Sequence, residues 1–118
     1  MPYSPKRGEV WRVDLDPTVG SELQKSRPCV VVNADDIGRL PLRLVVPLTG
    51  WNPVFAAYPW CVQVAPAVGS GLTKQSSADT FQMRSVSVLR MTAHLGELSD
   101  ADMKAIAQAV AVSVDYEP

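Results

Sequence analysis

Apolar and polar residues alternate from Glu9 to Asp16, the period of a β-strand with one buried face. One face carries Trp11, Val13 and Leu15. The other face carries Val10, Arg12 and Asp14. We therefore predict a half-buried strand here, followed by a loop that Asp16-Pro17 opens and Arg27-Pro28 closes.

Four more segments along the chain have strand character. The continuous apolar run Cys29–Asn33 is typical of a central strand. In the next strand, which Thr49-Gly50 ends, one face is predicted to carry Leu42, Leu44, Val46 and Leu48. Trp60–Ala65 and Thr80–Leu89 supply further strand material.

The last quarter of the chain changes to a helical period. Ser99 is a suitable N-cap, and Asp100 and Asp102 place negative charge in the first turn of the expected helix. The apolar positions that then recur at helical spacing are Met103, Ile106, Ala107, Val110 and Val114. The chain is therefore predicted to be mainly β, with five to seven short strands and one C-terminal helix, and this density of strands favours a small barrel.

Length and composition indicate one globular domain over residues 1–118, with 47% hydrophobic and 19% charged residues. No apolar run approaches the ~20 residues of a membrane helix. The basic pair Lys6-Arg7 is followed by no apolar signal region, so we expect a cytoplasmic protein. The two cysteines, Cys29 and Cys61, lie in strand-like runs and are expected to be buried and reduced.

Charge is unevenly distributed along the chain. The net charge is −1, but residues 1–90 carry +3 and residues 91–118 carry −4. A modestly basic body with an acidic C-terminal face suits a short phosphate-bearing ligand. It does not favour sequence-blind binding to long duplex DNA, which needs many phosphate contacts.

Candidate chemistry lies in the loop Gly20–Pro28 and at the end of the Thr49 strand. Arg27 could pair with an acidic neighbour at the surface, and Thr49 could simply end its strand. Together with Glu22, however, they offer a guanidinium, a hydroxyl and a carboxylate, a set able to grip and cleave a phosphodiester without a metal.

No group of Asp, Glu and His has the spacing of metal ligands in the sequence, so we expect no metal and no cofactor. Asp35-Asp36 is the nearest candidate pair, but adjacent residues in a turn usually face solvent. The single histidine, His94, is predicted between the last strand and the helix, in a structural role.

Three aromatic residues lie in the loop Gly50–Pro59, just beyond Thr49: Trp51, Phe55 and Tyr58. Their rings could stack on unpaired bases, at ~1–3 kcal/mol each. They could equally cover the edge of a barrel or a second subunit.

Several blocks, in this order along nearly the whole chain, resemble toxins of the MazF/PemK type: Arg7–Trp11, Asp14–Glu22, Lys25–Val32, Pro47–Thr49, Gln82–Val86 and Gly96–Ser99. The stretch from Gly20-Ser21-Glu22 to Arg27-Pro28 is the most specific of them. The resemblance implies an SH3-like barrel with a C-terminal helix, a homodimer and metal-independent cleavage of single-stranded RNA.

The resemblance also implies roles for individual residues. Arg27 and Thr49 correspond to the catalytic arginine and threonine of the family, and Glu22 lies in its substrate loop. The positions implied or expected to contact RNA are Ser21, Lys25, Asn33, Trp51, Ser76, Gln82 and Arg84.

The function implied is that of a sequence-specific endoribonuclease toxin acting on mRNA. Attack by the ribose 2′-hydroxyl would leave a 2′,3′-cyclic phosphate and a 5′-hydroxyl, and a MazE-like antitoxin with a disordered acidic tail would hold the toxin inactive. Two alternatives remain open. One is a non-enzymatic toxin of the CcdB type that binds DNA gyrase, and the other is a plain SH3-like interaction module. Neither needs Arg27 and Thr49 as a pair.

Overall fold

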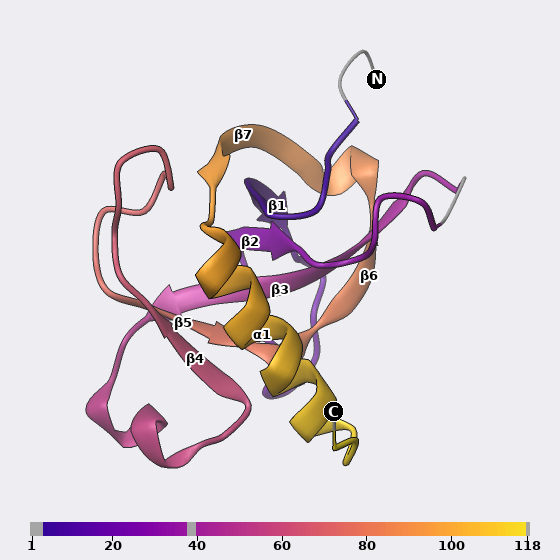
Figure 1. The fold of residues 1–118 in the computed structure, drawn as a ribbon. Coiled ribbons are helices and arrows are strands. Elements are labelled where there is room, and N and C mark those ends of the chain that lie inside the picture. The colour runs from indigo at the N-terminus through magenta and orange to yellow at the C-terminus, as the bar shows by residue number, and fades with distance from the viewer. Residues whose placement is uncertain (1–3, 38–39, 118) are drawn as a thin grey trace.

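The computed structural model describes residues 4–37 and 40–117, and residues 1–3 of the N-terminal segment considered above lie outside this range. Seven antiparallel strands form one bent sheet in the order β4-β5-β3-β2-β1-β7, with β6 added to β3 (Figure 1). A single α-helix, α1 (Asp100–Ser113), crosses the sheet. The bounds of the strands are β1 Glu9–Asp14, β2 Ser26–Val31, β3 Leu42–Gly50, β4 Cys61–Val64, β5 Ser76–Asp79, β6 Arg84–Ser87 and β7 Met91–Glu97.

The long strand β3 joins the two halves of the sheet. Its first part pairs with β6 and with β2, down to the pair Cys29↔Pro47. From Leu48 onward it pairs with β5 instead, as Leu48↔Ala78 and Thr49↔Ser77. Thr49 is therefore the penultimate residue of β3, close to the strand end predicted from the sequence.

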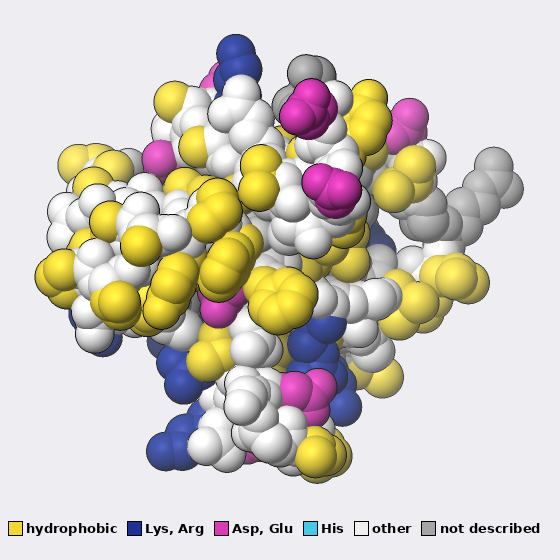
Figure 2. Space-filling model, turned by 90° about the horizontal axis from the view of Figure 1, so that it is seen from below, with side chains coloured by type: hydrophobic (Ala, Val, Ile, Leu, Met, Phe, Trp, Pro, Cys, Tyr) yellow, Lys and Arg dark blue, Asp and Glu magenta, His cyan; other side chains and the backbone are white. Residues whose placement is uncertain are grey.

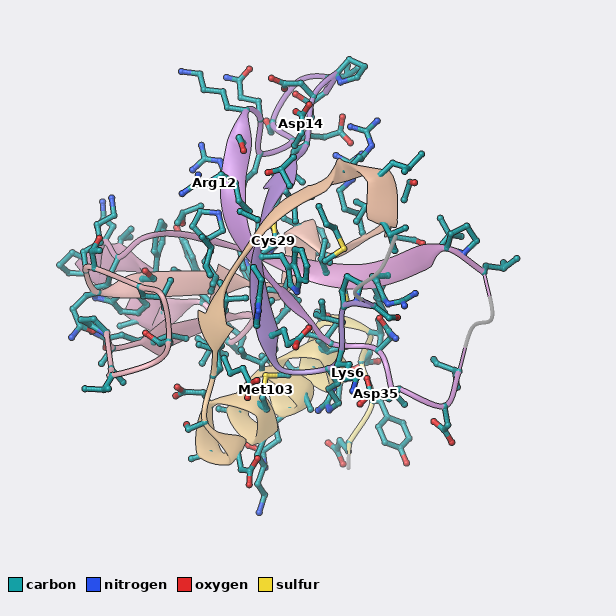
Figure 3. All side chains as sticks on the ribbon, turned by 90° about the horizontal axis from the view of Figure 1, so that it is seen from above. Lys6, Arg12, Asp14, Cys29, Asp35 and Met103 are labelled. Carbon is teal, nitrogen blue, oxygen red and sulfur yellow. The ribbon has the colours of Figure 1, made fainter. Side chains whose placement is uncertain are left out.

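Two hydrophobic clusters lie on opposite faces of the central strands. On the helix side, Val30 and Val46 pack with Met103 and Ile106. On the other side, Cys29 and Val31 pack with Trp11 and others. Because alternate residues of a strand face opposite sides, this arrangement explains why Cys29, Val30 and Val31 are all fully buried. Figure 3 shows Cys29 near the middle of the molecule and Met103 on the helix.

The helix begins as the sequence predicts. The Ser99 hydroxyl accepts a hydrogen bond from the Asp102 amide at 3.1 Å. The buried stripe is Met103, Ile106 and Ala109, however, whereas Ala107 and Val114 are exposed. The predicted apolar stripe was too wide, because Ala107 lies beside the buried face of the helix and Val114 is already the C-cap.

Three short 3₁₀ helices interrupt the strand segments: η1 (Pro53–Ala57), η2 (Thr80–Gln82) and η3 (Val88–Arg90). The predicted strand Thr80–Leu89 is consequently reduced to β6. The side chain of Asp79 accepts from the Phe81 amide at 3.1 Å, and that of Ser87 accepts from the Leu89 amide at 3.1 Å. These two side chains start helical turns on either side of the strand.

Two strands lie where the sequence predicted none. The small residues of β5 and the mixed residues of β7 show no apolar alternation. His94, which was expected between the last strand and the helix, lies inside β7, opposite Trp11 of β1. No helix in the described parts of the chain is long and apolar enough to cross a membrane.

Candidate active site

A surface groove of about 430 Å³ lies between the β1–β2 loop and the segment from η2 to β6. The loop contributes Ser21, Glu22 and Leu23, and η2 and β6 contribute Gln82 and Arg84. The remaining lining residues are Leu15, Pro47, Phe81 and Met83. Four residues that the sequence singled out therefore meet in one groove: Ser21, Glu22, Gln82 and Arg84.

Two side chains hold the loop against the rest of the groove. The Gln82 amide accepts from the Leu23 amide at 3.2 Å and donates through Nε2 to the Ser21 carbonyl at 3.0 Å. Arg84 donates through Nη1 to the Leu15 carbonyl at 3.0 Å. Gln82 was predicted to contact RNA, whereas in this structure both polar atoms of its side chain position the loop.

The base of the loop is closed by backbone contacts. Lys25 has a left-handed φ of 70°. Its amide donates to Asp16 Oδ1 at 3.0 Å, and its carbonyl accepts from the Leu15 amide at 3.0 Å. The Lys25 side chain is exposed, so its ammonium group lies at the surface beside the groove.

Glu22 lies on the exposed wall of the groove and shapes its own turn. Its Oε1 accepts from the Val19 amide at 2.7 Å, and its amide donates to the Val19 carbonyl at 3.2 Å. These two contacts fix the carboxylate at the mouth of the groove rather than leaving it on a free side chain.

Arg27 lies in β2, half-exposed, opposite Val13 of β1. Its Nε donates to the Gln24 carbonyl at 2.9 Å, which ties the guanidinium to the loop. The β2–β3 register, continued two residues past Cys29↔Pro47, sets Arg27 level with Thr49. From Leu48 onward β3 pairs with β5, so Arg27 and Thr49 belong to different strand pairings.

Burial and nearby positive charges affect the pKa of the Cys29 thiol. Burial raises the pKa of its thiol to about 12, and the positive charges of Arg84 and then Arg27 act in the opposite direction. Arg27 shares the face of β2 that carries Cys29, and Arg84 is paired with Val45, so both arginines lie on the side of the sheet where Pro47 lines the groove. Cys29 is neutral and buried, as expected, and is not a nucleophile.

The groove lining given above does not include Lys25, Arg27 or Thr49, and the remaining predicted contact residues lie apart from it as well. Asn33 follows the far end of β2, where its Oδ1 accepts from the Leu44 amide at 3.0 Å. Ser76 is 4% exposed and donates to the Lys74 carbonyl at 3.0 Å. Trp51 is half-buried and makes an edge contact with Phe55 at 5.8 Å.

A chain of aromatic contacts leads from Trp51 back to the groove. Tyr58 stacks on Trp60 with centroids 4.9 Å apart, and Trp60 lies 6.2 Å from Phe81. Phe81 is 76% exposed and lines both the groove and an adjoining apolar hollow next to Trp60. Figure 2 shows hydrophobic side chains gathered on the face seen from below, with Lys and Arg side chains beside them.

Trp60 and Phe81 were missed as candidates by the sequence analysis. Trp60 was placed in a strand, and Phe81 was included in a strand segment that the structure replaces with a 3₁₀ turn. The available signal was the position of Phe81, directly before the candidate residue Gln82.

Comparison with known proteins identifies the family and the fold. Residues 6–114 match the family of PemK-like, MazF-like toxins of type II toxin–antitoxin systems. The chain belongs to this family. The family predicted from the sequence blocks is therefore confirmed, and so is the mainly β fold with one C-terminal helix.

Relatives that align over most of the chain are endoribonucleases. The chain is 34% identical over 116 residues to endoribonuclease MazF9 of Mycobacterium tuberculosis, with 93% of this chain and 96% of that protein covered. It is 31% identical over 110 residues to endoribonuclease EndoA of Bacillus subtilis, with 92% and 93% covered. These relatives, aligned over most of the chain, confirm the predicted enzyme class, that of an endoribonuclease.

Solved structures share the fold. MazF from Deinococcus radiodurans superposes with a TM-score of 0.78 at 21% identity, over 96% of this chain and 98% of that one. An endoribonuclease from a mycobacterial species, solved in complex with its cognate antitoxin, gives 0.75 at 22% identity, over 97% and 98%.

Proposed function

We propose that this MazF-family chain is a sequence-specific endoribonuclease that cleaves single-stranded mRNA. The ribose 2′-hydroxyl attacks the adjacent phosphorus, and the products are a 2′,3′-cyclic phosphate and a free 5′-hydroxyl. The observation that carries the proposal is the strand register, which places Arg27 and Arg84 on the face of the sheet where Pro47 lines an open groove. The endoribonuclease relatives support RNA as the substrate.

Arg27 and Thr49 are assigned to the phosphate. The Arg27 fork donates to the non-bridging oxygens as negative charge builds on them, and the Thr49 hydroxyl adds a second donor. Fixed donors of this kind each contribute ~3 kcal/mol to transition-state stabilisation. The Nε contact to Gln24 holds the guanidinium in place before substrate binds.

Glu22 is assigned to the proton of the nucleophile. Its carboxylate stands at the mouth of the groove, held by the Val19 amide, and accepts the proton of the 2′-hydroxyl. Arg27 retains its proton throughout, because guanidinium stays charged at physiological pH. Water protonates the leaving 5′-oxygen.

The bases flanking the cleaved bond are assigned to the groove walls and the aromatic residues beside them. Ser21, Lys25 and Arg84 supply polar and cationic contacts, Gln82 fixes the loop, and Trp51 offers a ring for a more distant base. We assign no RNA contact to Asn33 or Ser76, since one lies at the far end of β2 and the other is buried in β5.

The antitoxin that regulates the toxin is assigned to the same surface. A cognate antitoxin with an acidic, disordered tail would occupy the groove lined by Arg84, and the antitoxin complexes of structural relatives support such a partner. We further propose that the toxin acts as a homodimer in the cytoplasm, as the sequence resemblance implies.

The deciding experiment is cleavage of a long unstructured RNA by purified protein in excess EDTA, with the new ends mapped. We expect cuts at a short recurring sequence, and 5′-hydroxyl ends. The same RNA with a 2′-deoxyribose at one mapped site should remain intact there. Cleavage of the deoxy substrate would contradict attack by the 2′-hydroxyl, and intact RNA under all conditions would favour a gyrase-binding toxin instead.

A further inference from the structure

Two glutamates face each other where β1 pairs with β7. Glu9 and Glu97 are directly opposed in the strand register, and Glu9 is only 3% exposed. Like charges at directly opposed positions destabilise a sheet, and burying a carboxylate is costly unless a positive charge accompanies it. The start of β1 therefore favours a cation beside these two carboxylates.

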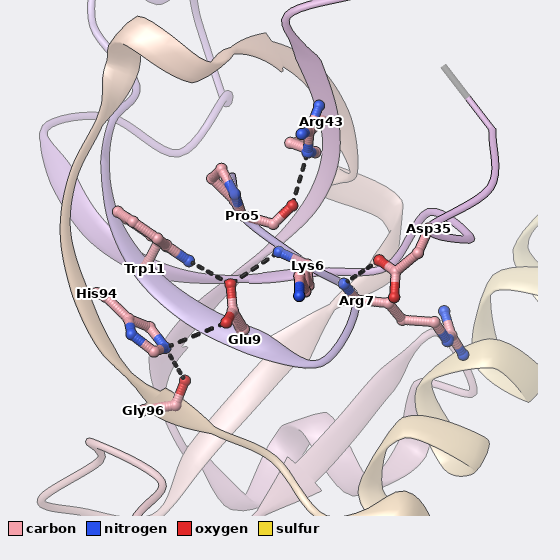
Figure 4. A network of polar contacts seen from close by, with 9 residues as sticks. All are labelled: Pro5, Lys6, Arg7, Glu9, Trp11, Asp35, Arg43, His94 and Gly96. Atoms are coloured by element: carbon pink, nitrogen blue, oxygen red, sulfur yellow. Dashed lines mark hydrogen bonds and ion pairs between the residues drawn. The ribbon is translucent and has the colours of Figure 1, made fainter. Parts of the chain in front are cut away.

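The imidazole of His94 completes the cluster. His94 Nε2 lies 3.7 Å from Glu9 Oε2 and 3.2 Å from the Gly96 carbonyl oxygen (Figure 4). One ligand atom each of Glu9, His94 and Glu97 lies within 4.8 Å of the other two. We propose that these three side chains bind a divalent transition-metal ion, and that the ion is zinc.

The distances suit zinc coordination. Bonds of ~2.0–2.2 Å in a tetrahedral site place neighbouring ligand atoms ~3.3 Å apart. His94 Nε2 and Glu9 Oε2 are 3.7 Å apart and the Glu97 ligand atom lies within 4.8 Å of both, so the side chains must draw together to coordinate one ion. In the bound form the imidazole proton sits on Nδ1, and water or the Gly96 carbonyl takes the fourth position. A nitrogen ligand favours zinc over magnesium, which prefers oxygen alone.

Neighbouring groups already orient the proposed ligands. Glu9 Oε1 accepts from the Lys6 amide at 2.7 Å and from Trp11 Nε1 at 3.1 Å, which turns Oε2 toward His94 (Figure 4). The Trp11 ring stacks on the imidazole, with centroids 5.2 Å apart and planes 23° apart. Contacts that fix ligand orientation in this way are typical of metal sites.

The site is accessible from solvent. His94, Gly96 and Glu97 line an open hollow of about 540 Å³, and Asp102 in the first turn of α1 lines it as well. Hydrated ions can therefore reach the cluster, and the surrounding acidic groups favour their entry.

The proposed ion has a structural role and is separate from the chemistry of the groove. Glu9 begins β1 and Leu15, just past its end, lines the groove, so the strand of six residues separates the two sites by roughly 20 Å. Bound zinc would join β1 to β7, close to the start of the helix. The inference is independent of the proposed function, because it predicts a change in stability and none in RNA cleavage.

The test uses untagged full-length protein, freed of metal by chelation and titrated with zinc chloride by calorimetry and thermal unfolding at pH 7. We expect one equivalent to bind per chain and Tm to rise by several degrees, with no effect of magnesium chloride. His94→Gln and Glu97→Gln replace exposed side chains and should lose both effects. Glu117→Gln, an exposed acidic position after the helix, and Cys61→Ser, the half-exposed thiol, are controls that should retain them.

The assignment of the nitrogen ligand can be checked directly, because His94 is the only histidine of the chain. Zinc should shift the single set of imidazole resonances in stoichiometric proportion. Absence of saturable zinc binding to the wild-type protein would overturn the proposal, and so would equal binding by His94→Gln.

Discussion

Gln82 joins the two walls of the groove by donating from Nε2 to the Ser21 carbonyl at 3.0 Å, across 61 residues of sequence. Its Oε1 accepts from the Leu23 amide of the same loop at 3.2 Å. The loop that carries Glu22 and leads to Arg27 is therefore positioned by one side chain of η2.

Replacing Gln82 should impair cleavage without unfolding the protein. Gln82→Ala removes two hydrogen bonds, each contributing about 1 kcal/mol, and frees the loop. We expect kcat to fall about tenfold, which corresponds to ~1.4 kcal/mol of barrier. Gln63→Ala is a suitable control, because Gln63 is exposed and its side chain donates to the Gln75 side chain, away from the groove lining. A Gln82→Ala enzyme with wild-type kcat would show that the anchor is dispensable.

The assignment of Arg27 and Thr49 predicts two losses of different size. Arg27→Ala should abolish cleavage, and Arg27→Lys should restore little, because a lysine lacks the planar fork. Thr49→Ser should remain active, whereas Thr49→Ala should lose at least tenfold in rate. Rates are measured on a short RNA with one mapped site, and circular dichroism checks the fold. Near wild-type cleavage by Arg27→Ala would disprove the assigned site.

Cys29 should make stability depend on alkaline pH. Burial raises the pKa of its thiol from 9.0 to about 12, so the folded chain retains a proton that the unfolded chain loses. The stabilising contribution is complete below pH 9 and is lost as the pH rises toward 12. Urea unfolding of the wild-type protein and of Cys29→Ala at several pH values between 8 and 11 should show a steeper decline for the wild type.

The reactivity of the two thiols provides a second test of the burial of Cys29. In the native protein at pH 8, a disulfide reagent should react with half-exposed Cys61 and leave buried Cys29 unmodified until urea is added. In Cys61→Ser the native protein should not react. Rapid modification of Cys29 in that variant would contradict the burial on which the pH prediction rests.

Antitoxin and RNA should compete for one groove. A peptide from the acidic tail of the cognate antitoxin should protect amides of the β1–β2 loop from hydrogen exchange and raise KM for RNA while leaving kcat unchanged. Light scattering at micromolar concentration should give the mass of a dimer. A monomer would refute the proposed assembly, and inhibition without protection of the loop would refute the shared groove.

Much of the fold follows from apolar periodicity, and the exceptions have physical causes. The two-sided burial around β2 produces the continuous run at Cys29 that predicted a central strand. The strand β7 has no such pattern, because its pairing depends on contacts distant in sequence. At Gly96 an added Cβ would lie 2.4 Å from the Gly69 carbonyl oxygen, so the nearby loop requires glycine at this position. Apolar periodicity in the sequence does not reveal that loop contact.

The residues of the candidate site likewise differ in whether the sequence could indicate them. Arg27, Thr49 and Glu22 could be proposed from the sequence because loops and strand ends carry chemistry. The loop-positioning contacts of Gln82 and the exposure of Phe81 could not be predicted from the sequence, since both depend on how η2 packs. The cluster of Glu9, His94 and Glu97 was also missed, because its members meet only through the pairing of β1 with β7.

The division of β3 between two sets of partners has a consequence for the geometry of catalysis. Arg27 is carried by the half of the sheet that contains β2, while Thr49 is hydrogen-bonded into the half that contains β5. In the proposed assignment, the separation of these two phosphate-binding groups depends on the change of strand partners between Pro47 and Leu48. Because α1 packs against β4, we expect that a rotation of the β4–β5 hairpin would change this separation.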